Sequence, residues 1–259
     1  LFTAFTAVAQ VTQDDINYEV IDGTSFVRVT GTPLPNNQQP ITINIPETVS
    51  NASSQFTVIE ISNNAFNGAN VETLSLPNTL LVIDNGAFIN NPLTDVTIPD
   101  SVTRIGLDAF ANSDLTIVTL GASLETIDNG AFLNNDLTSI TIPENVETIG
   151  NGAFNENPTI TTIEVLATTP PTTIANSFGS RTDINITVPD TALTNYQNST
   201  SWDGFFSINN QYDGNLGRQF NNIEGINYTI TAGGVPNTVT ITANANTGNV
   251  VIPSVVTLN

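Results

Sequence analysis

The 259-residue chain is 39% hydrophobic and only 11% charged, a balance that suffices for a buried core. Its 24 acidic residues stand against four arginines, which gives a formal net charge of -20 and disfavours nucleic acid and anionic membrane surfaces as partners. The sequence has no cysteine and no histidine, which excludes disulfides, thiol nucleophiles, imidazole bases and the commonest zinc ligands.

The first nine residues, LFTAFTAVA, are apolar and uncharged, and they end in the small-x-small pattern of Ala7-Val8-Ala9. This pattern is typical of a signal-peptidase cleavage site, so we predict that residues 1–9 are the remnant of a secretory signal peptide. A short core strand is the alternative, because so short a run cannot span a bilayer. No other segment is long and apolar enough to do so, and we predict no membrane insertion.

The next segment alternates between apolar and polar side chains. Residues 16–31 read INYEVIDGTSFVRVTG, with Asp22-Gly23 near the middle. Asp-Gly between two alternating runs is a strong hairpin signal. We therefore predict a β-hairpin within an N-terminal β cap over residues 10–45.

Beyond this segment the sequence is periodic. The pair Ala-Phe recurs every 22 residues, and the hexapeptide IDNGAF occurs unchanged at 83–88 and 127–132. The copies of the pair are Ala65-Phe66, Ala87-Phe88, Ala109-Phe110, Ala131-Phe132 and Ala153-Phe154. A fixed period of this length is typical of a solenoid, in which each coil buries its apolar face against its neighbours. We predict such a solenoid, with a C-terminal cap, over residues 46–208.

Each repeat unit holds two short apolar-alternating runs. The spacing of two within the second run is the strand period, so its apolar side chains are predicted to point inward. In the first run the apolar residues are Val58, Leu80, Val102, Leu124 and Val146, then Ile61, Ile83, Ile105, Ile127 and Ile149. In the second run they are Val71, Leu93, Leu115 and Leu137, then Leu74, Val96, Val118 and Ile140, then Leu76, Ile98, Leu120 and Ile142.

A tight turn is predicted between the two runs. Glycine permits it at Gly86, Gly130 and Gly152, and the phenylalanine that follows is expected to form a stacked column of rings. Asparagine side chains just beyond the rings are expected to bond the backbone of the turns, whose polar groups a stacked coil cannot expose to water. These asparagines are Asn90, Asn112, Asn134, Asn91, Asn135 and Asn157.

The C-terminal part contains a closing segment and then a second beginning. We predict that Tyr196, Trp202, Phe205 and Phe206 close the open end of the core. Further on, GINYTITAGG echoes the earlier DINYEVIDGT. We therefore predict a linker followed by the N-terminal β cap of a second, truncated repeat array over residues 209–259.

The repeat pattern, apolar-x-x-Ile-x-x-x-Ala-Phe followed by Leu-x-x-Ile-x-Ile-Pro, resembles the BspA-like leucine-rich repeats found in surface proteins of Bacteroidetes and some protists. The resemblance spans about residues 40–208. It implies a mainly β, leucine-rich-repeat solenoid at the bacterial cell surface or outside the cell. Where that family often has cysteine after the phenylalanine, this chain has asparagine.

Catalytic chemistry has few candidates in this sequence. Serine lacks a histidine or lysine to activate it, so a carboxylate pair is the one common arrangement left. The acidic residues that could supply one, Asp95, Glu125, Glu147 and Glu164, fall at variable outward positions of the repeats. Because acidic residues at such positions are usually solvated, we predict no enzymatic activity and no cofactor.

Calcium is an open alternative, since many carboxylates and amide carbonyls are close together in the sequence. However, Asp14-Asp15, Asp84 and Asp128 lack the alternating aspartate spacing that wraps a single ion. We therefore assign no metal site from the sequence.

The outward side chains of the second run form the predicted ligand-binding face. They are Ser75, Asp95, Thr97, Ile117, Thr119, Ser139, Thr141, Thr162 and Glu164. By its family resemblance we expect a secreted or cell-surface adhesion module, monomeric within a longer chain, that binds an extracellular protein or polysaccharide. The alternative is a passive spacer that extends a distal domain. Ile117, the clear apolar residue in these columns, slightly favours binding.

Overall fold

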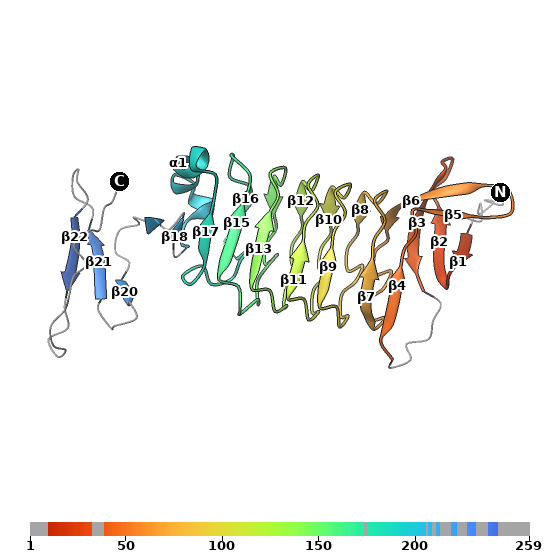
Figure 1. The fold of residues 1–259 in the computed structure, drawn as a ribbon, viewed down its shortest axis with the longest axis horizontal. Coiled ribbons are helices and arrows are strands. Elements are labelled where there is room, and N and C mark those ends of the chain that lie inside the picture. The colour runs from red at the N-terminus through yellow and green to blue at the C-terminus, as the bar shows by residue number, and fades with distance from the viewer. Residues whose placement is uncertain are drawn as a thin grey trace, which may run out of the picture.

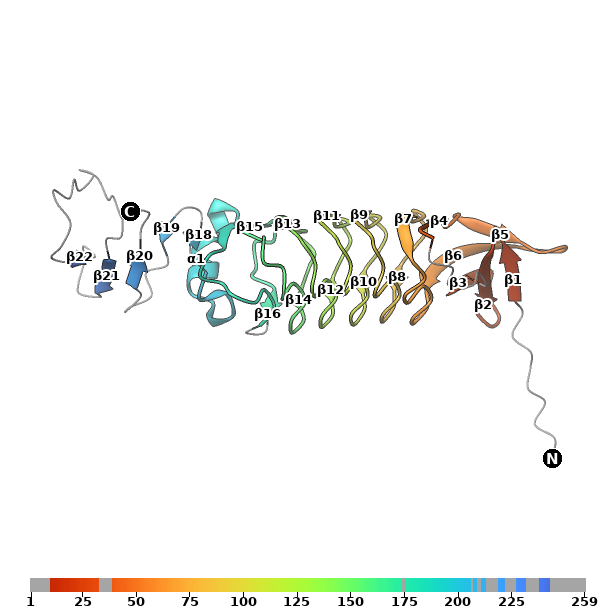
Figure 2. The same ribbon diagram turned by 90° about the horizontal axis from the view of Figure 1, so that it is seen from below.

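The computed structural model describes residues 10–32, 39–173, 176–205 and 207–208, together with strands at 211–212, 219–221, 227–231 and 238–242. The repeat region winds into a β-solenoid whose coils stack along the long axis of the molecule (Figure 1). Two rows of strands line opposite sides of the stack (Figure 2). The predicted mainly β, leucine-rich-repeat solenoid is confirmed.

One row of strands forms a continuous ten-stranded sheet, called the long sheet below. Along the repeats its strands pair in parallel, one per coil, so that Ile61, Ile83 and Ile105 lie side by side in register. The bounds are β1 Gln10–Gln13, β2 Ile16–Val20, β3 Phe26–Gly31, β5 Thr48–Ser50, β6 Gln55–Ile61, β8 Val82–Ile83, β10 Arg104–Ile105, β12 Thr126–Ile127, β14 Thr148–Ile149 and β16 Thr172–Thr173.

The strands of the opposite row are divided into shorter sheets. β4 pairs with β7, β9 with β11, and β13, β15, β17, β18 and β19 form a third sheet, so the ladder is interrupted between β7 and β9 and between β11 and β13. The bounds are β4 Ile41–Asn44, β7 Val71–Ser75, β9 Asp95–Thr97, β11 Ile117–Thr119, β13 Ser139–Ile142, β15 Thr162–Val165, β17 Asn185–Thr187, β18 Ser207–Ile208 and β19 Gln211–Tyr212.

The apolar columns predicted from the repeat fill the space between the two rows. All residues of the two first-run columns, from Val58 to Val146 and from Ile61 to Ile149, are at most 3% exposed. In the second run, Leu74, Leu76 and Leu120 are half-buried and pack against the core. Because each coil contributes the same inward positions, the core is one continuous cluster from end to end.

The phenylalanines of the Ala-Phe pairs form the predicted stack. From Phe66 to Phe178, neighbouring ring centroids lie 5.1–5.5 Å apart and the ring planes differ by at most 10°. Backbone bonds hold the same spacing, since the Phe88 amide donates to the Ala109 carbonyl oxygen at 2.8 Å and the Phe110 amide to that of Ala131 at 2.8 Å.

Two positions in each turn have a left-handed backbone, which suits glycine and, at lower cost, asparagine or aspartate. The first column has φ values of 53–67° at Asn64, Gly86, Asp108, Gly130 and Gly152. The second has 54–62° at Gly68, Asn90, Asn112, Asn134 and Glu156. The glycine turns are therefore confirmed, and asparagine, aspartate or, at position 156, glutamate takes the same backbone in other coils.

Buried asparagines, three residues after the phenylalanines, link adjacent coils by hydrogen bonds. Asn135 is 3% exposed, and its amide nitrogen donates to the carbonyl oxygens of Phe110, Phe132 and Leu133 at 3.0–3.3 Å. Its amide oxygen accepts the backbone N–H of Leu115 at 3.1 Å. The sets of bonds made by Asn91 and Asn157 are equivalent. Ser113 occupies this column in the coil between those of Asn91 and Asn135, and its buried hydroxyl has no hydrogen-bond partner.

The N-terminal end of the core is covered by antiparallel strands. β2 and β3 form the predicted hairpin around Asp22-Gly23, and β1 adds a third strand on the far side of β2. β3 then pairs in parallel with β6, which joins these strands to the long sheet. β4 lies within residues 10–45 but pairs with β7 of the opposite row.

The C-terminal end is covered by short helices. These are the 3-10 helices η1 Asp190–Ala192 and η2 Thr200–Trp202 and the α-helix α1 Leu193–Gln197. Trp202 and Phe205 are 1% exposed and lie against Phe178, the last ring of the stack. Tyr196 donates its hydroxyl to the Ala167 carbonyl oxygen at 2.9 Å. These three residues close the core as predicted, whereas Phe206 lies outside the described residues.

The predictions for the two ends of the chain are not tested by the described residues. The predicted signal-peptide remnant at residues 1–9 lies outside the described residues. Three antiparallel strands, β20 Gln219–Asn221, β21 Asn227–Thr231 and β22 Thr238–Thr242, are described within residues 209–259. The division of the chain into cap, solenoid, linker and second cap remains a prediction.

Candidate binding surface

The outward side chains of the second row form a surface that we call the strand face. All nine residues predicted for it are exposed: Ser75, Asp95, Thr97, Ile117, Thr119, Ser139, Thr141, Thr162 and Glu164. They form two columns, because alternate residues of a strand point outward, and β7 contributes only Ser75. Binding by these residues remains a prediction, since exposure alone does not identify a ligand.

The register shows which of these residues are neighbours. Thr97 pairs with Thr119 and Asp95 with Ile117, while Thr141 pairs with Glu164 and Ser139 with Thr162. The Thr141 hydroxyl donates to the Glu164 carboxylate at 3.1 Å. The column of Ser75 continues at both ends, with Asn44 beside Ser75 and Thr187 beside Glu164. The face is therefore longer than the sequence analysis proposed.

Apolar side chains are rare on the strand face. Ile117 is 62% exposed, the largest exposure among the large hydrophobic residues of the described chain. Leu166, which directly follows β15, is 44% exposed. Removing exposed apolar surface from water is favourable. A partner that covers Ile117 and Leu166 would therefore gain binding free energy at these two positions of the face.

A groove lies where β11 and β13 fail to pair. Most coils have proline followed by a polar residue after the second run, but the coil of β11 has Gly121-Ala122. A Cβ at Gly121 would lie 2.6 Å from the carbonyl carbon of Pro99, so only glycine allows the chain to approach the preceding coil so closely. The Ala122 amide also donates to the Asp100 carboxylate at 2.9 Å.

The groove spans the coil of β11, the coil before it and the two coils after it. The groove has a volume of about 330 Å³ and combines acidic, hydroxyl and apolar side chains. Its lining residues are Asp100, Val118, Thr119, Leu120, Ala122, Thr141, Pro143, Glu144 and Leu166. Thr119 and Thr141 also belong to the strand face, so the groove and the predicted face form one surface.

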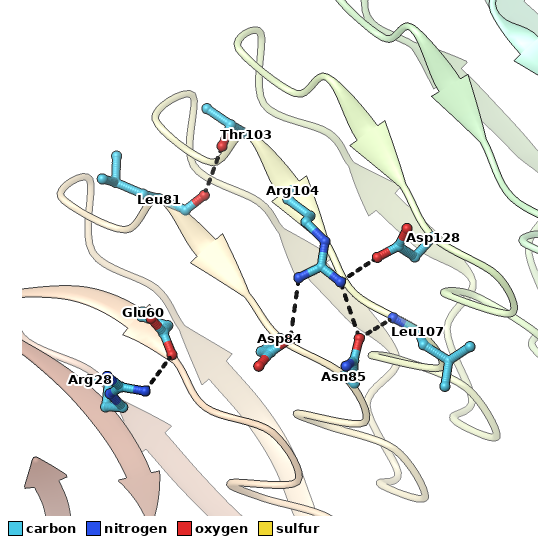
Figure 3. A network of polar contacts seen from close by, with 9 residues as sticks. All are labelled: Arg28, Glu60, Leu81, Asp84, Asn85, Thr103, Arg104, Leu107 and Asp128. Atoms are coloured by element: carbon cyan, nitrogen blue, oxygen red, sulfur yellow. Dashed lines mark hydrogen bonds and ion pairs between the residues drawn. The ribbon is translucent and has the colours of Figure 1, made fainter.

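The long sheet presents a different outward surface, on which cations are paired with carboxylates. Arg104 on β10 donates to Asp84 at 3.2 Å and to Asn85 at 3.3 Å, and it forms an ion pair with Asp128 (Figure 3). Burial lowers the pKa of Arg104, but the hydrogen bonds and charges of Asp128 and Asp84 outweigh burial and raise it overall. This network links three successive coils.

The other described arginines also lie away from the strand face. Arg28 on β3 contacts Glu19 at 3.7 Å and Glu60 at 3.5 Å, both on the long sheet. Arg181 in the C-terminal part donates to backbone carbonyl oxygens, and burial lowers its pKa. Within the described residues, the strand face therefore carries carboxylates without a cation, and its potential is negative.

Sequence reasoning found the strand face but missed the groove. The residues it missed include Asp100, Glu144 and Leu166, which belong to turns rather than to strands. The available signal was Gly121-Ala122 at a position where neighbouring units have Pro-Asp or Pro-Glu. That signal predicts a local irregularity, whereas the groove depends on how adjacent coils pack together.

Two further structural findings bear on function. Within the described part of the chain, no group of three or more acidic residues is arranged to hold a metal ion. In the same part, no helix has the length and apolar character needed to cross a bilayer.

Solved structures with a similar fold come from bacteria. A leucine-rich repeat protein from Bacteroides ovatus is 23% identical with a TM-score of 0.51, over 71% of this chain and 56% of that one. A leucine-rich repeat protein from Bacteroides capillosus is 25% identical with a TM-score of 0.41, over 60% and 97% of the two chains. The pneumococcal vaccine antigen PcpA is 17% identical with a TM-score of 0.48, over 71% and 65%.

The chain thus spans little more than half the length of the Bacteroides ovatus protein, with which it shares the fold. No curated protein sequence matches it. The sequence model of the BspA type leucine rich repeat region matches residues 59–185 in six copies. Residues 59–185 are therefore a BspA-type leucine-rich repeat region.

Proposed function

We propose that the protein is a secreted or cell-surface adhesion module that binds an extracellular protein through the strand face. The solenoid supports this role because its coils hold a long row of outward side chains on a rigid, fully packed frame. Those side chains vary from coil to coil without disturbing the core. Such a surface suits recognition, in which a partner contacts many coils at once.

The observation that carries the proposal is the groove between β11 and β13. It joins the hydroxyls of Thr119 and Thr141 to apolar carbon from Leu120 and Leu166. A concave site with apolar walls and a few polar groups is typical of binding surfaces. A uniform polar face would have favoured the passive spacer, which remains the second candidate function.

A polysaccharide partner receives less support from the strand face. The large exposed hydrophobic residues of the described chain include one aromatic, Phe26, and it lies on β3 of the long sheet. The strand face therefore offers no exposed aromatic ring within the described residues on which a sugar could stack. A protein partner fits the mixed apolar and hydroxyl surface better.

The proposal can be tested by a binding screen of the whole chain. The panel contains extracellular matrix proteins, host glycoproteins and polysaccharides, at physiological salt, with and without calcium. Thr141→Arg places a large cation on the strand face, and Thr148→Arg makes the same change at an exposed position of the long sheet. We expect a saturable partner whose affinity falls at least about tenfold with Thr141→Arg and stays unchanged with Thr148→Arg. Equal effects of both changes would contradict binding through the strand face, and no partner on the panel would support the spacer.

A further inference from the structure

The groove between β11 and β13 is lined by two carboxylates, which point to the chemical class of the group that it binds. Asp100 and Glu144 lie in equivalent turns of the coils on either side of Ala122, and all three residues line the groove. Ala122 is shorter than either acid, so only a methyl group stands at the equivalent position between the two carboxylates. The orientation of Asp100 is fixed by the bond that its carboxylate accepts from the Ala122 amide at 2.9 Å.

Apolar carbon lies between and beside these carboxylates. The groove is lined by Leu120, Pro143 and Leu166, and Leu166 is 44% exposed. Arginine buries its aliphatic stem against apolar surface while its guanidinium remains near water or carboxylates. A lining of two carboxylates and several aliphatic groups matches both parts of that side chain.

The wider surface has the same sign of charge. Asp95 and Glu164 are exposed on the strand face, and the Glu164 carboxylate is held by Thr141. The described cations Arg28 and Arg104 lie on the long sheet, each next to two carboxylates. An anionic groove within an anionic face repels acidic partners and speeds the encounter with basic ones.

We propose that the groove between β11 and β13 binds an arginine side chain of an extended, basic segment of the partner protein. This inference rests on the proposed function of the strand face and adds the chemistry of the partner. The guanidinium lies between the carboxylates of Asp100 and Glu144, and the stem lies on Leu120 and Pro143. Planar, bidentate pairing favours arginine over lysine at such a site.

Two peptide libraries test the inference on the whole chain. Both contain nonapeptides that are randomised around a fixed central residue, which is arginine in one library and citrulline in the other. Citrulline keeps the stem and the planar head but lacks the charge. We expect the arginine library to bind at least about tenfold more tightly in fluorescence anisotropy at physiological salt, with a difference that shrinks at high salt.

Matched variants locate the effect. Glu144→Gln removes one carboxylate from the groove, and Glu147→Gln removes one from an exposed position beside β14 of the long sheet. Both lower the net negative charge by one. We expect Glu144→Gln to weaken the arginine library about tenfold and Glu147→Gln to change it less than twofold. Equal binding of the two libraries, equal effects of the two variants, or no binding by either library would overturn the inference.

The outcomes also separate this inference from the proposed function. If a partner from the protein panel is lost with Thr141→Arg but is insensitive to Glu144→Gln, the strand face binds it without an arginine in the groove. In that case the inference fails and the proposed function stands. If the partner is insensitive to Thr141→Arg as well, both fail.

Discussion

Replacing Asn135 by alanine should destabilise the solenoid far more than the loss of one surface amide would. Asn135 is 3% exposed and makes four hydrogen bonds to backbone groups of its own and the preceding coil. Alanine leaves the N–H of Leu115 without this acceptor, inside a stack that water cannot enter. A buried donor without a partner costs about 1–3 kcal/mol, and the carbonyl oxygens of Phe110 and Phe132 lose a donor in addition.

We therefore expect Asn135→Ala to lower the free energy of unfolding by about 3 kcal/mol. Ser113→Ala is the matched control, because Ser113 occupies the same column and its buried hydroxyl has no partner. Removing an unsatisfied hydroxyl should leave stability unchanged or raise it slightly. Ser113→Asn restores the amide of the other coils and should stabilise the chain by about 1 kcal/mol or more.

Equilibrium unfolding in urea measures these differences in the free energy of unfolding. Two variants are compared only if their unfolding free energy falls with urea concentration at the same slope. Two changes to alanine in a single buried column should therefore differ, because Asn135→Ala lowers stability whereas Ser113→Ala leaves it unchanged or raises it. This expectation would be refuted if Asn135→Ala and Ser113→Ala destabilised the chain equally, or if the cost of Asn135→Ala stayed below about 1 kcal/mol.

Three further changes test other parts of the fold. Phe110→Ala removes a ring that is fully buried in the stack. It should lower the free energy of unfolding by about 3–5 kcal/mol in the same assay, and a far smaller loss would contradict a packed core. Glu156 has a left-handed backbone with φ 56°, which glycine adopts at lower cost. Glu156→Gly should therefore raise the free energy of unfolding by up to about 1 kcal/mol and raise the midpoint of thermal unfolding. A lower midpoint would contradict the turn geometry. Burial, and secondarily the charge of Asp14, raises the pKa of Tyr18 to about 12, so its contribution to stability is complete below pH 10 and is lost as the pH rises toward 12. Tyr18→Phe should reduce the loss of stability between pH 9 and 11, and an unchanged pH dependence would count against a buried phenol.

The sequence was a good guide to the fold because the repeat supplies the same information several times. The register of the long sheet follows from the 22-residue period, since Ile83 pairs with Ile105 and Ile105 with Ile127. The period also predicted the stacked rings and the buried asparagines Asn91, Asn135 and Asn157. The prediction was wrong for Asn90, Asn112 and Asn134, which are exposed and donate to asparagine side chains of the preceding coil instead of the backbone. It gave no sign that β1 adds a third strand to the hairpin, because that strand lies outside the repeat.

Other details were harder to predict because they depend on contacts between coils. Asp108 has a left-handed backbone where Gly86 and Gly130 have it, although aspartate alone is a weak signal for that conformation. The groove is lined by residues of successive coils, among them Asp100, Glu144 and Leu166, and no single repeat unit reveals how these come together. Leu166 was missed because it directly follows its strand and falls outside the alternating columns.

The proposal that the strand face is the binding surface can be tested most directly by site-specific labelling. Because the chain has no cysteine, Thr141→Cys and Thr148→Cys each introduce a single thiol, on the strand face and on the long sheet respectively. Each variant is labelled with a maleimide-linked polyethylene glycol, and its saturable binding to the panel of extracellular proteins is compared with that of the unlabelled form. The account predicts that the label at position 141 abolishes binding and that the label at position 148 leaves it intact. Binding that survives the label at 141, or is lost equally with either label, would contradict the account.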